Sequence, residues 1–205
     1  MAEKPDMLRF ENEYYDKGYK YIAGVDEAGR GPLAGPVFAA AVIFEKGVVI
    51  DEINDSKKLS EKKREELFDV IKEKALCYAI VSADEKEIDT INILAATLKC
   101  FNRAVSALDV TPDIALIDGN RVGDMPVECQ TIVKGDANSM SIAAASILAK
   151  VARDRYITEM GEKYPEYNFQ KHKGYGTKEH LEAIAKYGPS PIHRLTFKGV
   201  REYVK

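Results

Sequence analysis

The sequence predicts an α/β fold in which a mixed five-stranded sheet is flanked by helices, with a small helical lobe at the C-terminal end. Two observations lead to this prediction. Three short apolar runs come first, and helical and strand patterns then alternate along the rest of the chain. This order is typical of a sheet that combines antiparallel and parallel neighbours and carries helices on both faces.

The three early strands are expected at residues 21–25, 37–44 and 76–82, where apolar residues form short runs. The first two are joined by a segment rich in Pro and Gly, the kind of turn that antiparallel neighbours use. Apolar residues at helical spacing then predict one helix after Ser60, which would be its N-cap. The same spacing predicts a longer helix over residues 91–108.

Two later strands are expected at residues 114–117 and 127–133, and a long helix follows from about Ser139 to Lys163. The first half of this helix, residues 140–149, carries no charge on any face. A helix that is apolar all round is buried, so we expect this half to pack against the sheet.

The final segment, residues 164–205, holds many turn residues and one short helical pattern near residues 177–187. We expect it to form a lobe packed beside a core of residues 18–163, within a single domain of residues 1–205. A chain of 205 residues, 45% of them apolar, is long enough for one domain with a substantial core.

The composition argues against a membrane protein or a secreted one. No apolar run approaches the roughly 18 residues of a membrane helix, and the first 20 residues are charged and polar, so neither a transmembrane helix nor a signal peptide is expected. Cys77, Cys100 and Cys129 form no C-x-x-C pair, which favours reduced thiols over a zinc site or a disulfide framework. We therefore expect a cytoplasmic protein.

The net charge of −3 is divided unevenly along the chain. Residues 134–205 contain 13 Lys and Arg against 8 Asp and Glu, a balance of +5, whereas residues 1–133 carry −8. A basic half of this kind can face a phosphate backbone. Uneven but solvated surface charge explains the skew nearly as well.

The most informative segment is residues 24–36, which read G-V-D-E-A-G-R-G-P-L-A-G-P. An apolar strand ends there in Asp26 and Glu27, and glycines flank Arg30. Alternation along a strand would send the two carboxylates to opposite faces, but a bend in the glycine-rich turn lets both reach one site. Taken alone, the segment is equally compatible with a polar turn that carries two solvated acids.

Two further apolar runs each deliver an aspartate beside a glycine: Asp118 in I-A-L-I-D-G-N and Asp136 in T-I-V-K-G-D. Together with the first pair they make four carboxylates that can converge at one edge of the sheet. Such a cluster needs cations, and oxygen ligands without His or Cys favour magnesium or manganese over zinc. Two ions about 4 Å apart would activate a water and stabilise the leaving oxygen of a phosphodiester.

Five segments of the chain resemble those of bacterial ribonuclease HII and occur in the same order as in that family, over residues 21–198. They are G-V-D-E-A-G-R-G-P-L-A-G-P-V, D-S-K-K-L-S, I-D-G-N, V-K-G-D-A-N-S-M-S-I-A-A-A-S-I-L-A-K-V-A-R-D and H-K-G-Y-G-T. The related ribonuclease HIII places a lysine and a glutamate where this chain has Arg30 and Asp136. One departure is Thr196, which stands where the H-R-x-S-F tail of the family has serine and keeps the hydroxyl.

The resemblance implies a ribonuclease H-like fold and an endonuclease that acts on RNA–DNA hybrids and on ribonucleotide-containing duplex DNA. In that family a single embedded ribonucleotide is cut on its 5′ side, which leaves 3′-hydroxyl and 5′-phosphate ends. The catalytic and metal-binding residues would be Asp26, Glu27, Asp118 and Asp136, with two Mg²⁺ or Mn²⁺ ions during catalysis. The sequence leaves the choice of metal open, and we expect a monomer.

The resemblance also implies residues that contact the substrate. Gly29, Arg30 and Gly31 would bind the ribose 2′-hydroxyl through their backbone, and Tyr175 would contact the nucleotide at the RNA–DNA junction. Without the resemblance, a tyrosine that covers its own loop is the simpler interpretation of G-Y-G-T.

Further residues are candidates for contact with the substrate, and some of them have a simpler alternative. Lys57 and Lys58 can hold a phosphate, although lysines before a helix are usually solvated. Ser139 can contact a phosphate or cap the helix that follows it, and capping is the favoured role. Arg153 or Arg155 can track the substrate backbone.

Two other functional classes remain open at this level. A resolvase- or transposase-like nuclease would use the same acids but would leave the G-R-G and G-Y-G-T turns without a role. A non-catalytic protein that binds hybrids would lack one or more of the acids, and all four are present.

Overall fold

The computed structural model describes residues 6–53, 56 and 59–204. Its strands form one sheet in the order β3-β2-β1-β4-β5. Antiparallel pairing joins β1 to β2 and β2 to β3, whereas β4 is parallel to both β1 and β5. The predicted mixed five-stranded sheet is therefore confirmed. The strands are β1 Ile22–Ala28, β2 Val37–Ile43, β3 Cys77–Ala83, β4 Ile114–Asp118 and β5 Cys129–Ile132.

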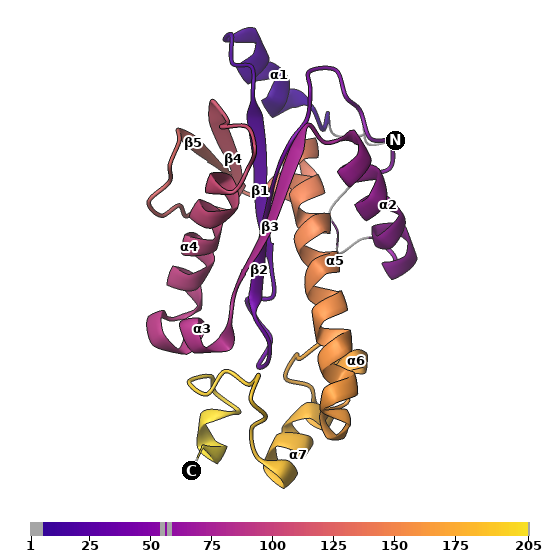
Figure 1. Cartoon of the computed structure of the whole chain (residues 1–205), viewed down its shortest axis with the longest axis vertical. Helices are drawn as coiled ribbons and strands as arrows, with labels where there is room; N and C mark the ends of the chain where they lie inside the picture. Colours follow the sequence, from indigo (N-terminus) through magenta and orange to yellow (C-terminus); the bar gives the residue numbers. More distant parts are fainter. Residues whose placement is uncertain (1–5, 54–55, 57–58, 205) are drawn as a thin grey trace.

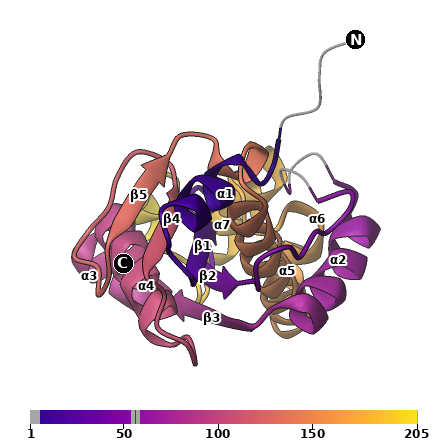
Figure 2. The same cartoon turned by 90° about the horizontal axis from the view of Figure 1, so that it is seen from above.

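Helices cover both faces of the sheet, as the view from above shows (Figure 2). One face packs on α3 and α4 and the other on α2 and α5, each through its own cluster of buried apolar side chains. A further helix, α1, lies at the end of the sheet opposite the C-terminal lobe (Figure 1). These helices are α1 Arg9–Asp16, α2 Glu61–Lys74, α3 Glu85–Ile91, α4 Ile93–Ser106 and α5 Met140–Lys163.

The long helix α5 lies directly against β1 because Gly24 has no side chain. A Cβ atom at Gly24 would lie 2.0 Å from the carbonyl carbon of Ser141 and 2.3 Å from its oxygen. The uncharged half of α5 is fully buried in this contact, as its sequence predicts. Helix and strand therefore meet backbone to backbone at the strand that carries the first two acids.

The C-terminal lobe lies below the end of β1 and is reached by the last turns of α5 (Figure 1). It contains α6 Phe169–His172, α7 Lys178–Tyr187 and the 3₁₀ helices η3 Pro165–Tyr167 and η4 Arg201–Tyr203. Phe169 and Ile184 of the lobe share a buried cluster with Leu33 and Ile157 of the core. The described part of the lobe thus packs on the core, and the single-domain boundary stays a prediction.

Several predicted boundaries differ from the observed ones. The helix expected over residues 91–108 is α4, which begins two residues later because Asn92 has a φ of 69° and its side chain caps α4 through the amide of Ala95. The preceding helix α3, which ends at Ile91, was not predicted. The strand expected at residues 127–133 is shorter, since Lys134 adopts a left-handed conformation just after it. The short amphipathic helix α1 was not predicted.

No helix in the described ranges combines the length and apolar character needed to cross a membrane. All three cysteines are free thiols, two of them buried.

Candidate active site

The sheet brings the first and third acids together at the carboxyl ends of two parallel strands. Val25 of β1 is paired with Ile117 of β4, so Asp26 and Asp118 follow at neighbouring positions of the same edge. Asp26 is 4% exposed, and Glu27 and Asp118 are half-buried. Strand β1 continues to Ala28, so both acids lie within the strand and the glycine-rich turn begins after them.

Neighbouring carboxylates affect the protonation of Asp26 and Glu27. Burial raises the pKa of Asp26 well above its usual value, and the charges of Glu27 and Asp118 raise it further. Burial also raises the pKa of Glu27; nearby Arg30 opposes this shift, and the charge of Asp118 reinforces it. Asp26 is held in place by the amide of Glu27, at 2.7 Å, and by a hydrogen bond with Ser146 of α5.

The fourth acid is tied to the third through the backbone. Asp136 lies in the short 3₁₀ helix η2, Gly135–Ala137, which follows β5. The Oδ1 atom of Asp118 accepts hydrogen bonds from the amide of Gly135, at 2.7 Å, and from that of Asp136, at 3.4 Å. A Cβ atom at Gly135 would lie 2.5 Å from Ile142 Cδ1 and 3.3 Å from Asp118 Oδ1, so a side chain there would have to displace the buried Ile142.

The donor set fits a hard divalent cation, because it consists of carboxylate oxygens on which burial and mutual repulsion disfavour the charged form. Among the described residues, no group of three or more His, Cys, Asp or Glu is already arranged to hold a metal ion.

The G-R-G turn, Glu27 and Tyr175 line one hollow of about 300 Å³. The Tyr175 ring is 46% exposed, and its Cε1 atom lies 3.5 Å from where a Cβ on Gly31 would be. The side chain of Arg30 is half exposed and reaches Glu27 at 3.4 Å. A smaller hollow of about 100 Å³ is lined by Glu27, Arg30 and Asp118, so both hollows adjoin the acids.

Arg194 holds the G-R-G turn from the protein side, a role that the sequence did not reveal. It is fully buried, and its guanidinium donates to the carbonyls of Gly29, Arg30 and Pro32 at 2.6–2.9 Å. Its Nε atom also donates to the carbonyl of Gly35 at 2.9 Å. Burial lowers the pKa of Arg194 to about 9, and the neighbouring charge of Arg153 adds to the effect.

Arg153 is a second buried arginine behind the same turn. It donates to the carbonyls of Ala34 and Lys173, and its Nε has no hydrogen-bond partner in the described part of the chain. A Cβ atom on Gly29 would lie 2.2 Å from this Nε, which explains a glycine there. Arg155, the other candidate for tracking the substrate, is instead paired with Glu65 on the surface.

The remaining residues predicted to contact substrate do not line the hollow or lie outside the described residues. Ser139 has no exposed surface; its hydroxyl donates to Glu11 at 2.6 Å and accepts from the amide of Ile142 at the start of α5. The structure thus shows the capping role and leaves no surface for a phosphate. Lys57 and Lys58 lie outside the described residues.

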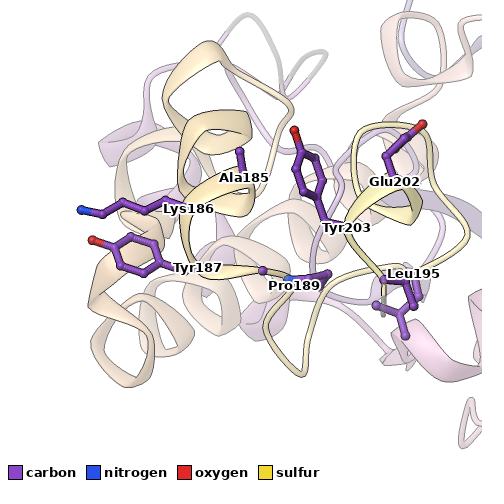
Figure 3. A pocket seen from close by; sticks show the side chains of 9 residues that line it. Ala185, Lys186, Tyr187, Pro189, Leu195, Glu202 and Tyr203 are labelled. Carbon is purple, nitrogen blue, oxygen red and sulfur yellow. The ribbon is translucent and has the colours of Figure 1, made fainter.

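A larger hollow, of about 630 Å³, lies in the C-terminal lobe between the end of α7 and η4. Its walls include Tyr187, Leu195 and Tyr203, which stand apart from one another around the opening (Figure 3). None of the predicted catalytic or substrate-binding residues lines it. Size alone therefore does not identify the active site, and the chemistry is at the sheet edge.

Comparison with known proteins identifies the family of the chain. A family model described as Ribonuclease HII matches residues 23–200. A ribonuclease HII from Acetivibrio thermocellus is 59% identical over 192 residues, which cover 94% of this chain and 75% of that protein. Another from Ruminiclostridium cellulolyticum is 56% identical over 205 residues, 100% of this chain and 80% of that protein.

Solved structures show the same fold. The crystal structure of ribonuclease H2 from Pyrococcus horikoshii OT3 matches with a TM-score of 0.75 and 30% identity, over 89% of this chain and 96% of that one. A ribonuclease HIII crystallised in complex with Mn²⁺ matches with a TM-score of 0.65 at 17% identity, over 90% of this chain and 69% of that one, which shows the fold alone. The expected resemblance is confirmed, and the chain belongs to the ribonuclease HII family.

Proposed function

We propose that Asp26, Glu27, Asp118 and Asp136 form the catalytic centre of this chain. As a ribonuclease HII it cleaves RNA in RNA–DNA hybrids and at ribonucleotides embedded in DNA. The observation that carries the proposal is the convergence of three strand ends, where Asp118 faces the charges of the first two acids and binds the backbone amide of the fourth.

Members of the family depend on divalent metal, and the four carboxylates are the residues that would hold Mg²⁺ or Mn²⁺ here. When bound, two such ions would activate a water for attack on the phosphodiester and offset the charge on the leaving oxygen, giving 3′-hydroxyl and 5′-phosphate ends. The chain supplies the fixed positions: the Glu27 amide and Ser146 orient Asp26, and the Gly135 amide orients Asp118.

The G-R-G turn is suited to recognise the ribose 2′-hydroxyl. Arg194 occupies the carbonyls of Gly29 and Arg30, which fixes the peptide planes of the turn. The amides of Arg30 and Gly31 donate to no backbone carbonyl among the described residues, so they are available to a hydroxyl acceptor. A substrate without the hydroxyl leaves these groups unpaired, and such a loss discriminates strongly between ribose and deoxyribose.

Tyr175 would stack on the nucleotide at the RNA–DNA junction. This residue is half exposed and lines the same hollow, and aromatic rings in this setting bind sugars and bases of any sequence. The lobe therefore completes the substrate site. We further infer that Lys57 and Lys58 add a phosphate contact and that the protein acts as a monomer in the bacterial cytoplasm.

The test uses a labelled DNA duplex with one ribonucleotide, an all-DNA duplex as its control, and magnesium followed by EDTA. We expect a single nick on the 5′ side of the ribonucleotide that EDTA abolishes. Asp118→Asn should lose cleavage but still bind the duplex, whereas Asp69→Asn, an exposed aspartate on α2, should cleave like the wild type. Full activity of D118N, or nicking of the all-DNA duplex, would contradict the assignment.

A further inference from the structure

Three buried histidines lie in the C-terminal lobe, away from the acids, and two of them form a hydrogen-bonded chain that ends at the substrate hollow. His180 is fully buried and His193 is 1% exposed. Their Nε2 atoms lie 2.9 Å apart. At one end of the chain the amide of Ser190 donates to Nδ1 of His193 at 2.8 Å. At the other end Nδ1 of His180 lies 2.9 Å from the carbonyl oxygen of Tyr175.

The chemistry of the two ends fixes the direction of this chain. A backbone amide can only donate, so Nδ1 of His193 accepts and its neutral ring carries hydrogen on Nε2. That hydrogen is donated to Nε2 of His180, whose own hydrogen is therefore on Nδ1, where it is donated to Tyr175. Burial lowers the pKa of His180 to about 4 and that of His193 to about 3, so both rings are neutral at neutral pH.

The Tyr175 backbone is held on both sides. Its carbonyl accepts from His180 and also from the amide of Thr177 at 2.8 Å. Its own amide donates to the carbonyl of His172 at 2.9 Å, and the carbonyl of Gly174 accepts from the amide of Leu33, next to the G-R-G turn. Because the Tyr175 ring is 46% exposed, its direction depends mainly on the backbone that carries it.

We propose that His193 and His180 are positioning residues that set the Tyr175 ring against the G-R-G turn for stacking on the ribonucleotide. This inference rests on the proposed function, in which Tyr175 contacts the substrate. Without the His180 hydrogen bond, the carbonyl of Tyr175 keeps only the hydrogen bond from the amide of Thr177. The exposed ring then samples several orientations. The affinity for substrate then falls, and the whole of this loss requires the Tyr175 ring.

The test combines His180→Phe with Tyr175→Ala in a double-mutant cycle, with KM and kcat measured on the duplex that carries one ribonucleotide. H180F keeps an aromatic ring but loses the donor. We expect it to raise KM about tenfold, part of the range known for base–aromatic stacking, and to leave kcat nearly unchanged. In the Y175A background the same substitution should change KM by less than about twofold. His180→Asn, whose amide can donate near the Nδ1 position, should recover most of the wild-type KM.

Tyr167→Phe is the matched control, because it removes a buried hydrogen bond to the Gly188 carbonyl within the same lobe. Its effect should be small and equal in both backgrounds. An H180F effect that is equally large with and without Tyr175 would overturn the inference. If H180F does not fold, His193→Phe tests the same path, since it removes the donor that fixes the His180 tautomer. If Y175A itself has no effect, the proposed contact of Tyr175 fails while the metal-dependent nick remains.

Discussion

The buried histidines predict how the stability of this protein responds to acid. Protonation of His180 would place an N–H group against another donor, because its Nε2 accepts from the N–H of His193. Nδ1 of His193 faces the amide of Ser190 at 2.8 Å and its hydroxyl at 2.7 Å, so protonation there would break the hydrogen bond from the amide. Burial is the main cause that lowers the pKa of His180 to about 4 and that of His193 to about 3. In the unfolded chain both groups would titrate near the usual value, about 6.5.

Between the folded and unfolded pKa values the unfolded state binds more protons, so stability falls as the pH falls through this window. At pH 5 the pKa values of both histidines in the folded state still lie below the pH. The loss in the free energy of unfolding is therefore set by the difference between pH 5 and the pKa in the unfolded state. A gap of about 1.5 pH units at about 1.4 kcal/mol per unit gives about 2 kcal/mol for each histidine. The raised pKa values of Asp26 and Glu27 act in the opposite direction.

The assay is urea denaturation of the wild type and of His180→Asn at pH 7.5 and at pH 5. The variant is less stable at the higher pH, but it should lose about 2 kcal/mol less than the wild type on acidification. The carboxylates contribute equally to both proteins, so their effect cancels in this comparison. Tyr167→Phe should keep the full wild-type loss, and equal losses in the wild type and H180N would refute the reasoning.

Three further substitutions test the packing around the site. Gly24→Ala places a Cβ 2.0 Å from the Ser141 backbone, so it should cost about 3 kcal/mol or more, seen as a fall in Tm of about 6–12 °C. Arg194→Lys leaves several of the four carbonyls unpaired and should cost about 2–3 kcal/mol in urea denaturation, whereas Arg103→Lys on the surface should cost under about 1 kcal/mol. Glu11→Ala removes the buried acceptor of Ser139 and Ser141 and should cost about 2–3 kcal/mol, most of which Glu11→Gln should restore. A wild-type Tm for G24A, or equal costs for R194K and R103K or for E11A and E11Q, would contradict the corresponding argument.

The acids could be predicted from the sequence because their signal is local. Asp26, Asp118 and Asp136 each follow an apolar strand and stand next to or near a glycine, and a strand end is visible within a few residues. Parallel pairing of β1 and β4 then places Asp26 and Asp118 side by side. The fold class was predictable for the same reason, since it depends on the order of locally recognisable elements.

The supporting residues left no such local signal. Arg194 donates to backbone carbonyls 159 to 165 positions earlier in the chain. Every residue has a backbone carbonyl, so the sequence does not indicate which of them an arginine will bind. Glu11 reads as a surface residue of a polar segment, yet it is 3% exposed and binds the start of α5. No role for the histidines could be predicted from the sequence, because their hydrogen-bond partners are mostly backbone groups and one another.

These long-range contacts also change the meaning of the charge distribution. The excess of basic residues after position 133 suggested a surface for phosphate, but Arg153 and Arg194 of that segment are buried and donate to carbonyls. They lie behind the G-R-G turn, and the acids lie beside it. A buried guanidinium that holds the carbonyls of a turn leaves the amides of that turn free for a ligand, and its charge favours an anionic one. These two arginines therefore act by shaping the turn from within, so a neutral residue at 194 should weaken ribose recognition more than the loss of any exposed lysine of the lobe.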